Sequence, residues 1–414
     1  MAILATTAAC RSCSTPLEHL VLDLGASPLA NRYLTPAQLG EPEPFYPLRL
    51  FVCDRCWLVQ LEAFASPEQI FGDYAYFSSY STTWLQHARA YVDMAVARFG
   101  LGPQSRVLEI ASNDGYLLQY VVARGIPAVG VEPARNVAET ARTRGIPTRV
   151  EFFGAECARA LAADGLRADL MVANNVFAHV PDLNDFVVGL KIALAPRGVL
   201  TLEFPHLLRL LEETQFDTIY HEHFSYYSLR AAETILAAHG LSVFDVEELP
   251  THGGSLRLYV RHAEDGTRPP TGRVAELLGR ERTAGLFEPG TYRRFGARVA
   301  ELKCALLEFL IAAKRAGRRI AGYGAAAKGN TLLNYCGVRT DFLDYTVDRS
   351  PHKQGKFLPG TRIPVFPPER LFETRPDWIL ILPWNLRAEI VESLAAVRDW
   401  GAEFVVPIPD VKPC

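Results

Sequence analysis

A short apolar run, Val107–Ala111, leads into the turn formers Ser-Asn-Asp-Gly115 and then into a helix-like segment that starts at Tyr116. A strand, a tight turn and a helix in this order form the first unit of a nucleotide-binding α/β domain. Glu109 then lies at the carboxyl end of the strand, beside a helix N-terminus, which suits a ligand with both an amine and a carboxylate. Glu132 closes the next strand-like segment, where an acidic side chain can accept hydrogen bonds from ribose hydroxyls.

This arrangement predicts a site for S-adenosylmethionine (SAM), which carries an amino acid group and a ribose on one molecule. Ala111 and Asn113 occupy positions where glycine is common, and asparagine tolerates the left-handed backbone that such a turn needs. NAD binding, a purely structural turn and a helix-capping role for Glu109 are the alternatives. The residues expected to contact the cofactor are Glu109, Ala111, Asn113, Gly115, Tyr116, Glu132, Pro133 and Asn174.

Strand-like and helix-like segments alternate between Pro67 and Arg261, which predicts a doubly wound parallel sheet. The last two strands are joined by the turn Leu249–Gly254, which is too short for a helical crossover, so they should pair antiparallel. A parallel sheet that ends in such a hairpin is the class I methyltransferase variant of the Rossmann fold. The expected strands are 106–111, 128–132, 148–153, 170–174, 199–204, 242–247 and 255–261.

Two Cys-x-x-Cys pairs lie before Ser66, among many turn-forming residues. Two residues between paired cysteines place both sulfurs on one side of a tight turn, and two such pairs supply four thiolates for a tetrahedral Zn²⁺ ion. A site closed by four protein ligands would be structural. The gap between the pairs is longer than usual, so redox-active pairs or a coincidental spacing are the alternatives. The expected metal ligands are Cys10, Cys13, Cys53 and Cys56.

These patterns predict three domains: a small zinc-binding domain over 1–66, a SAM-binding methyltransferase domain over 67–265, and a smaller Rossmann-like α/β domain over 266–414. The third domain should begin with a linker rich in glycine and proline, followed by a long helix through Tyr292–Ala316. Its expected strands are 319–324, 342–348, 378–383 and 403–407.

The loop Gly322–Gly329 follows a strand and precedes a helix in the third domain, where backbone amides can hold a phosphate and Lys328 can add charge. The basic loop Val347–Lys356 follows the next strand and could bind a diphosphate, with a solvated turn as the alternative. Trp384 and Asn385 could complete the pocket. The expected substrate contacts in this domain are Tyr323, Lys328, Asp348, His352 and Gln354.

The run Tyr220–Ser228 has the sequence YHEHFSYYS and follows the fifth strand. Two histidines beside a glutamate in aromatic surroundings are groups whose pKa can be tuned toward neutral pH, so that one of them can take a proton from carbon. Glu222 could fix the tautomer of His223 or stabilise its charged form, while His221 would point the other way from Glu222 in an extended segment. A second metal site that uses all three side chains is the alternative.

The fourth strand ends in the segment Asn174–Asp182, which faces the transferred methyl group in a Rossmann-like methyltransferase, so His179 and Asn175 are candidate site residues. A core or capping role is the alternative for His179. The run Phe71–Ser81 gathers tyrosines and hydroxyls just before the domain, and ordinary aromatic packing is its alternative. Its candidate site residues are Tyr74, Tyr76 and Tyr80.

The charge is nearly balanced, with 43 basic and 46 acidic side chains, which disfavours a nucleic-acid partner. The longest apolar stretches, such as Trp378–Trp384, are strand-sized and shorter than the roughly 20 residues that span a bilayer. The first ten residues lack the basic residues and the length of a signal peptide. We therefore expect a cytoplasmic protein without a membrane partner.

Taken together, the order of motifs resembles the SAM-dependent sugar C-methyltransferases of antibiotic deoxysugar pathways, and the resemblance covers nearly the full chain. The motifs that carry it are the two cysteine pairs, the run Phe71–Ser81, and the segments 107–115, 220–223, 252–257 and 322–329. The resemblance implies a three-domain monomer with structural zinc, SAM in the middle domain, and a C-terminal domain that helps to bind a thymidine-diphosphate (TDP) sugar. The implied substrate is a 4-keto-6-deoxy sugar that is methylated beside the ketone, most often at C3 and in some relatives at C5.

The same resemblance assigns the chemistry to Glu222 and His223, and it places His179 and the tyrosines of the Phe71–Ser81 run near the sugar. A hydrogen beside a ketone is acidic enough for a positioned base, so His223 could remove it to leave an enolate. Tyr76, His179 or Tyr220 could then donate to the enolate oxygen. An NAD-dependent nucleotide-sugar oxidoreductase and a zinc-ribbon regulatory protein that senses a nucleotide are the alternative functions.

Overall fold

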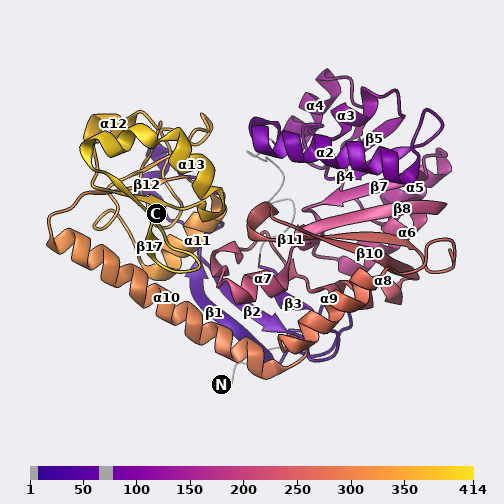
Figure 1. The fold of residues 1–414 in the computed structure, drawn as a ribbon, viewed down its shortest axis with the longest axis horizontal. Helices are drawn as coiled ribbons and strands as arrows, with labels where there is room; N and C mark the ends of the chain where they lie inside the picture. Colours follow the sequence, from indigo (N-terminus) through magenta and orange to yellow (C-terminus); the bar gives the residue numbers. More distant parts are fainter. Residues whose placement is uncertain (1–7, 65–77) are drawn as a thin grey trace.

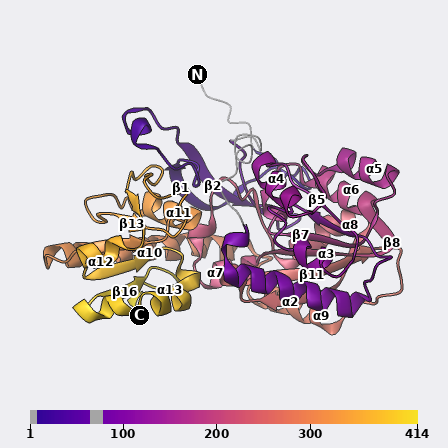
Figure 2. The ribbon, with the colours of Figure 1, turned by 90° about the horizontal axis from the view of Figure 1, so that it is seen from above.

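The chain folds around three β-sheets, one for each segment that the sequence sets apart, in a computed structural model that describes residues 8–64 and 78–414. Figure 1 shows the methyltransferase domain and the C-terminal domain side by side, with the first strands of the chain between and beneath them. The view from above in Figure 2 shows the same order. Residues from all three domains can therefore contribute to a functional site where the domains meet.

The middle sheet has seven strands in the order β10-β11-β8-β7-β4-β5-β6. Strands β4 to β8 run parallel, and β11 pairs antiparallel with both β8 and β10. The predicted methyltransferase variant of the Rossmann fold is confirmed. The bounds are β4 (Val107–Ile110), β5 (Ala128–Val131), β6 (Thr148–Arg149), β7 (Ala168–Asn174), β8 (Leu194–Pro205), β10 (Leu241–Leu249) and β11 (Ser255–His262).

Helices cover both faces of this sheet because its central strands are apolar on both sides. In β7, Leu170 and Val172 belong to the core under α2 and α3, whereas Met171 and Ala173 belong to the core under α5, α6 and α8. The helices are α2 (Thr82–Phe99), α3 (Leu118–Val122), α4 (Arg135–Thr143), α5 (Ala155–Ala163), α6 (Leu183–Ala193), α7 (Leu207–Glu212) and α8 (Leu229–Ala238).

The N-terminal sheet combines three early strands with one from the middle of the chain, in the order β1-β2-β3-β9. Strand β9 lies within the run Tyr220–Ser228, just after its histidines, and pairs antiparallel with β3. The two cysteine turns beside this sheet pack into the core of the methyltransferase domain, whereas the buried residues of the strands pack into the core that includes the C-terminal domain. The strands are β1 (His19–Ser27), β2 (Tyr46–Val52), β3 (Val59–Leu61) and β9 (Ser225–Tyr226).

The C-terminal sheet has the order β14-β13-β12-β15-β16-β17, parallel except for its last strand. Helix α10 (Pro289–Arg315) crosses from this domain to pack against β1, along the lower edge of the molecule in Figure 1. The strands are β12 (Ile320–Tyr323), β13 (Thr346–Val347), β14 (Val365–Phe366), β15 (Trp378–Ile381), β16 (Glu403–Val406) and β17 (Lys412–Pro413). The other helices are α11 (Ala327–Cys336), α12 (Arg370–Thr374) and α13 (Arg387–Ser393).

Some elements differ from the sequence prediction. Helix α9 (Gly272–Thr283) begins inside the predicted linker and packs against α8 and β10 of the methyltransferase domain, although the predicted division assigns it to the C-terminal domain. Its apolar stripe is short and its exposed side is charged, so the pattern is weak in the sequence. Strands β6 and β13 are shorter than predicted. Among the described residues, no helix combines the length and the hydropathy that crossing a membrane requires.

Candidate active site and metal centre

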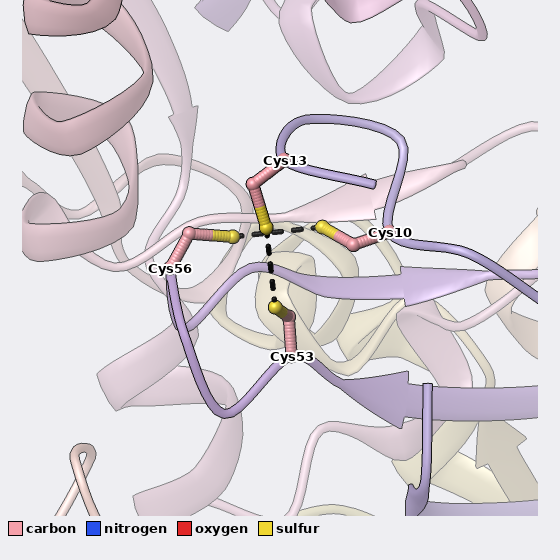
Figure 3. Close-up of side chains that lie close together, drawn as sticks. All are labelled: Cys10, Cys13, Cys53 and Cys56. Atoms are coloured by element: carbon pink, nitrogen blue, oxygen red, sulfur yellow. Dashed lines mark hydrogen bonds between the residues drawn. The ribbon is translucent and has the colours of Figure 1, made fainter. Parts of the chain in front are cut away.

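The four predicted metal ligands come together beside the N-terminal sheet, where β2 ends, and Figure 3 shows their sulfur atoms pointing toward one centre. The sulfurs lie within 4.8 Å of one another, with 3.5 Å between Cys10 and Cys56 and 3.5 Å between Cys13 and Cys53. Four thiolates around a tetrahedral Zn²⁺ at about 2.3 Å are about 3.8 Å apart, so the cluster fits zinc.

The turn between Cys10 and Cys13 also contacts the run Tyr220–Ser228, just after its histidines. The Arg11 guanidinium donates to the carbonyl oxygens of Leu61 and Pro181 and lies 5.3 Å from the ring centre of Phe224. The Asn184 amide of α6 donates to the carbonyl oxygens of Arg11 and Ser12. The metal centre thus braces the neighbourhood of His223 without contacting it.

The loop after β4 has the backbone that its sequence implies. Ala111, Asn113 and Gly115 all have positive φ angles, of 55°, 50° and 77°. A side chain at position 115 would also collide with Ile146. Glu132, at the end of β5, accepts the backbone N–H of Asn113 at 3.0 Å, which ties the two strand ends together.

Buried polar atoms around the loop after β4 indicate whether SAM fits there. In the part of the chain that the structure describes, Glu109 Oε2 and Asn174 Oδ1 are buried acceptors without a hydrogen-bond partner. Burial raises the pKa of Glu109, and the charges of Asp114 and Glu132 act in the same direction. A cationic ligand with N–H and O–H donors would satisfy these acceptors and offset the clustered negative charge. The loop therefore fits SAM, with Tyr116 buried beside it and Pro133 directly after Glu132.

His223 is held as a neutral base of defined tautomer. Its Nδ1 lies 3.0 Å from the carbonyl oxygen of Thr218, which can only accept, so Nδ1 carries the hydrogen. Its Nε2 lies 2.9 Å from the Tyr220 hydroxyl and accepts from it. Burial, together with the nearby charges of His179, His252 and Lys328, lowers the pKa of His223 well below its usual value. The tautomer is thus fixed by a backbone carbonyl and not by Glu222.

Glu222 and His179 lie beside this base. The Glu222 carboxylate accepts from the Asn31 amide at 2.8 and 3.0 Å, and burial raises its pKa to about 7. His179 donates from Nδ1 to the backbone carbonyl of Glu222 at 2.8 Å, and its ring centre lies 4.7 Å from that of His223. Burial lowers the pKa of His179 to about 4. Both histidines are therefore neutral at physiological pH.

The alternative of a second metal site at 221–223 is wrong for this structure. His221 turns away as predicted, toward the carbonyl oxygen of Pro47 at 3.1 Å, while Glu222 and His223 contact other groups. The three side chains diverge, and among the described residues only the four cysteines form a cluster of metal-ligand type.

A buried polar cluster beside the cofactor loop was not predicted. Glu203, at the end of β8, accepts from Arg257 at 2.7 Å and lies 3.1 Å from His87 Nε2. Burial opposes ionisation of Glu203, but His87 and Arg257 together lower its pKa. Trp84 stacks on His87 and lies 5.1 Å from the ring of His252, whose backbone has a positive φ of 56°. Their positions in three distant segments left no local pattern to detect.

The glycine-rich loop of the C-terminal domain is closed by protein side chains, one of which comes from the N-terminal domain. The backbone N–H of Ala325 donates to Asp348 at 2.7 Å, and the Ala325 carbonyl accepts from Tyr33 and Lys353. Gln354 donates to the backbone carbonyl of Asp348. Tyr323 is buried at the end of β12. The Ala325 amide is therefore satisfied within the protein.

Two other predicted substrate residues face the methyltransferase domain. Lys328 is partly buried, donates to the Asn385 side chain at 2.8 Å and lies 4.8 Å from the ring centre of Trp384. His352 stacks with Tyr80 at 6.1 Å between ring centres. The structure thus brings Tyr80, Lys328 and His352 to the boundary between the domains, whereas Tyr74 and Tyr76 lie outside the described residues.

A cavity of about 590 Å³ opens at the same boundary. The β10–β11 turn forms one wall and the ends of β15 and β16 form the other. Gly253 in the β10–β11 turn lies close to the opposite wall, since a Cβ on this residue would lie 2.6 Å from the Trp384 ring. The charged residues that line the cavity are Arg209, Glu213, Glu248, Arg387 and Lys412.

Comparison with known proteins decides the class of enzyme. Family models match a zinc binding domain at residues 10–71, a methyltransferase domain at 84–246 and a C-methyltransferase C-terminal domain at 250–409. The C-methyltransferase NovU of Streptomyces niveus is 38% identical over 403 residues, which cover 97% of this chain and 95% of that protein. The chain belongs to the SAM-dependent C-methyltransferases. As a C-methyltransferase it uses SAM and carries zinc in its N-terminal domain, as the sequence predicts.

More distant relatives match only parts of this C-methyltransferase. The ubiquinone biosynthesis O-methyltransferase of Chelativorans sp. (strain BNC1) is 29% identical over 120 residues, 27% of this chain and 47% of that protein. Magnesium protoporphyrin IX methyltransferase (ChlM) from Synechocystis PCC 6803 superimposes with a TM-score of 0.34 and 16% identity over 47% of this chain and 92% of its own. Membership of the C-methyltransferases leaves no support for the NAD-dependent and regulatory alternatives.

Proposed function

We propose that this C-methyltransferase transfers the methyl group of SAM to a TDP-linked 4-keto-6-deoxy sugar, at the carbon next to the ketone and specifically at C3. The observation that carries the proposal is the arrangement of His223, a neutral imidazole whose Nδ1 is committed to Thr218 and whose Nε2 points at Tyr220. Such a group is suited to accept a proton from carbon. Methylation at C5 of the same sugar is the second candidate, because C5 also lies beside the ketone.

In the proposed reaction, SAM supplies the methyl group. His223 Nε2 removes the hydrogen from the carbon beside the ketone, and the electron pair of the broken C–H bond moves into an enolate. To reach Nε2, the substrate replaces the Tyr220 hydroxyl, which becomes free to donate to the enolate oxygen. The carbon then forms its bond to the methyl group while the methyl–sulfur bond of SAM would break, with S-adenosylhomocysteine as the leaving group, and His223 later releases its proton to water.

The surroundings of the base support this assignment. His179 is neutral and fixed by the Glu222 carbonyl, so its Nε2 is oriented beside His223 without adding a charge. Partly buried Lys328 places a cation near His223 and so near the developing enolate, where a reduced exposure to water strengthens its effect. The methyl-donor loop follows β4, and His179, whose ring centre lies 4.7 Å from that of His223, follows the neighbouring parallel strand β7. A sugar bound beside the base would therefore lie on the side of the sheet where SAM is proposed to bind, which favours alignment of the two substrates.

The nucleotide part of the substrate is proposed to bind across the domain boundary, with Asn175, Tyr80, Lys328 and His352 among its contacts. Asn175 has a buried Nδ2 without a partner in the described residues and a positive φ of 54°, and it directly follows β7. Tyr74 and Tyr76 are proposed to complete the sugar site. Asp348 and Gln354 are instead proposed to shape the loop around Ala325.

The test is to incubate the enzyme with SAM and a panel of TDP-4-keto-6-deoxy sugars, and to follow the added methyl by mass spectrometry and its position by NMR. A sugar with a 4-hydroxyl in place of the ketone is the matched control and should gain no methyl. A methyl at C5 would support the second candidate. If folded, SAM-bound enzyme methylates no keto sugar, the proposed substrate is wrong.

A further inference from the structure

The carbonyl that fixes His223 belongs to a short segment held from the other domain. Thr218 ends the 3₁₀ helix η4 (Phe216–Thr218), and both of its neighbours are hydrogen-bonded to side chains of the C-terminal domain. On one side, the Trp384 indole N–H donates to Asp217 Oδ2 at 2.8 Å. On the other side, the Thr331 hydroxyl of α11 donates to the carbonyl oxygen of Ile219 at 3.1 Å.

Both contacts are fully buried, so neither partner can be replaced by water without a rearrangement. Asp217 and Ile219 are 0% exposed, and Thr331 is 2% exposed. An acceptor that loses its donor in such a place bears the cost of its desolvation, which the chain can recover only by moving. Movement at 217 or 219 displaces the Thr218 carbonyl between them.

Helix α11 reaches the second proposed site residue in the same way. Its Asn330 donates to the carbonyl oxygen of Ala30 at 2.6 Å, and the next residue, Asn31, holds the Glu222 carboxylate. Lys328, one turn earlier in the helix, lies against Trp384. One face of α11 therefore contacts the supports of both His223 and Glu222.

We propose that Thr331 and Trp384 are positioning residues for the base: from the C-terminal domain, Thr331 holds the backbone of Ile219 and Trp384 holds the side chain of Asp217, which is itself hydrogen-bonded to the backbone of Thr218, and together they fix the orientation and tautomer of His223. This inference rests on the proposed role of His223. It gives the C-terminal domain a part in proton abstraction, in addition to any contact with the nucleotide. The base is held in place only when that domain is docked.

The test uses the zinc- and SAM-loaded enzyme with T331V, which keeps the shape of the side chain but removes the hydroxyl, and W384F, which removes the indole N–H. Long-range ¹H–¹⁵N spectra report the tautomer of His223, with its signal assigned by its loss in H223N. We expect the Nδ1–H form in the unmodified enzyme and a detectable second form in both variants. On the sugar that the enzyme methylates, kcat should fall about 10- to 100-fold with KM within twofold.

Matched controls remove equivalent groups that serve only the C-terminal domain. W400F removes an indole N–H that donates to the Pro376 carbonyl, and T374V removes a hydroxyl that donates to the Arg370 carbonyl. Both should leave the His223 tautomer and kcat unchanged. T331S retains a hydroxyl and should restore the behaviour of the unmodified enzyme.

If T331V and W384F keep both the tautomer and the turnover of their controls, the positioning role is wrong. The tautomer is measured without any sugar. A shifted tautomer in an enzyme that methylates no keto sugar would therefore uphold the positioning role and reject the proposed substrate. An unshifted tautomer with sugar methylation would do the reverse.

Discussion

The backbone N–H of Asn113 donates to the carboxylate of Glu132, which joins the loop after β4 to the end of β5. The same carboxylate accepts the N–H of Ala134 two residues later. The C-terminal domain repeats the arrangement, because Asp348 accepts the N–H of Ala325 from the loop after β12 and that of Ser350 two residues later. In both domains an acid at the second strand shapes the glycine-type loop of the first.

This relationship predicts the effect of E132Q on the cofactor. The amide nitrogen of glutamine cannot accept an N–H, so the variant loses the charged acceptor that holds the SAM loop. We expect the affinity for SAM to fall about 10- to 100-fold by isothermal titration calorimetry, since hydrogen bonds to charged groups contribute about 1.5–3 kcal/mol. D348N is the matched control from the other domain and should leave SAM affinity unchanged. Equal affinity in E132Q would contradict the role given to the loop.

Replacing the proposed base should separate chemistry from binding. H223N should slow exchange of the substrate's α-hydrogen with deuterated solvent by about 10²- to 10⁴-fold, the usual contribution of a general base, with SAM affinity within twofold. Because burial lowers the pKa of His223, the unmodified enzyme should show no loss of activity from this group as the pH falls from 8 to 6.5. NMR of the substrate measures the exchange. Unchanged exchange in H223N would move the base to another residue, with H179N tested next.

Glu222 should make the protein less stable as the pH rises. Its pKa of about 7 exceeds the usual 4.5, so the folded state keeps a proton that the unfolded state releases between these values. The free energy of unfolding therefore falls over pH 4.5–7, and E222Q removes this loss. The free energy of unfolding of E222Q minus that of the unmodified enzyme should therefore be larger at pH 8 than at pH 4.5, by up to about 3 kcal/mol.

Urea unfolding of the zinc-loaded protein at the two pH values measures this difference. The exposed Glu139 on α4 provides the control, because E139Q should shift the free energy of unfolding little at either pH. A pH-independent difference between E222Q and the unmodified enzyme would show that Glu222 ionises normally.

The metal centre should be exchangeable without loss of chemistry. Co²⁺ in place of zinc should give the visible and near-ultraviolet absorption of tetrahedral thiolate coordination, with kcat within about twofold, because the four sulfurs leave no position for a substrate. C53S should abolish this absorption and lower stability. It should also speed amide exchange in β3 and β9, which are braced through Arg11. A large change of kcat in the cobalt enzyme would show that the metal acts in the reaction.

Local patterns carried most of what the sequence revealed. The cysteine pairs and the loop around Asn113 are each encoded within a few residues, and the comparisons confirm the cofactors and the class of enzyme that they indicate. The contacts that support the proposed base and its neighbours could not be predicted from the sequence. Asn31 meets Glu222, and Trp384 meets Asp217, across more than a hundred residues of chain, and no local periodicity records such contacts.

The predicted and the observed hydrogen-bond partner of His223 differ because the observed partner is a backbone atom. Glu222 adjoins His223 in sequence, which suggested that its carboxylate sets the tautomer, yet the ring instead meets the carbonyl of Thr218. Every residue has a carbonyl, so residue types do not show which carbonyl a side chain will meet. The roles of the individual site residues therefore stay predictions for the experiments above.

The pairing of β9 with β3 also bears on how the chain is made. During synthesis, β1, β2 and β3 leave the ribosome long before Ser225 and Tyr226 do, so the nascent N-terminal sheet has an open edge while the whole cofactor domain is being translated. Unpaired edges recruit other chains. A fragment that stops after β3 should aggregate, whereas one that extends through β9 supplies the missing strand. The enzyme thus closes its first sheet with the segment that carries its proposed base, so the N-terminal sheet is completed only once that base has been synthesised.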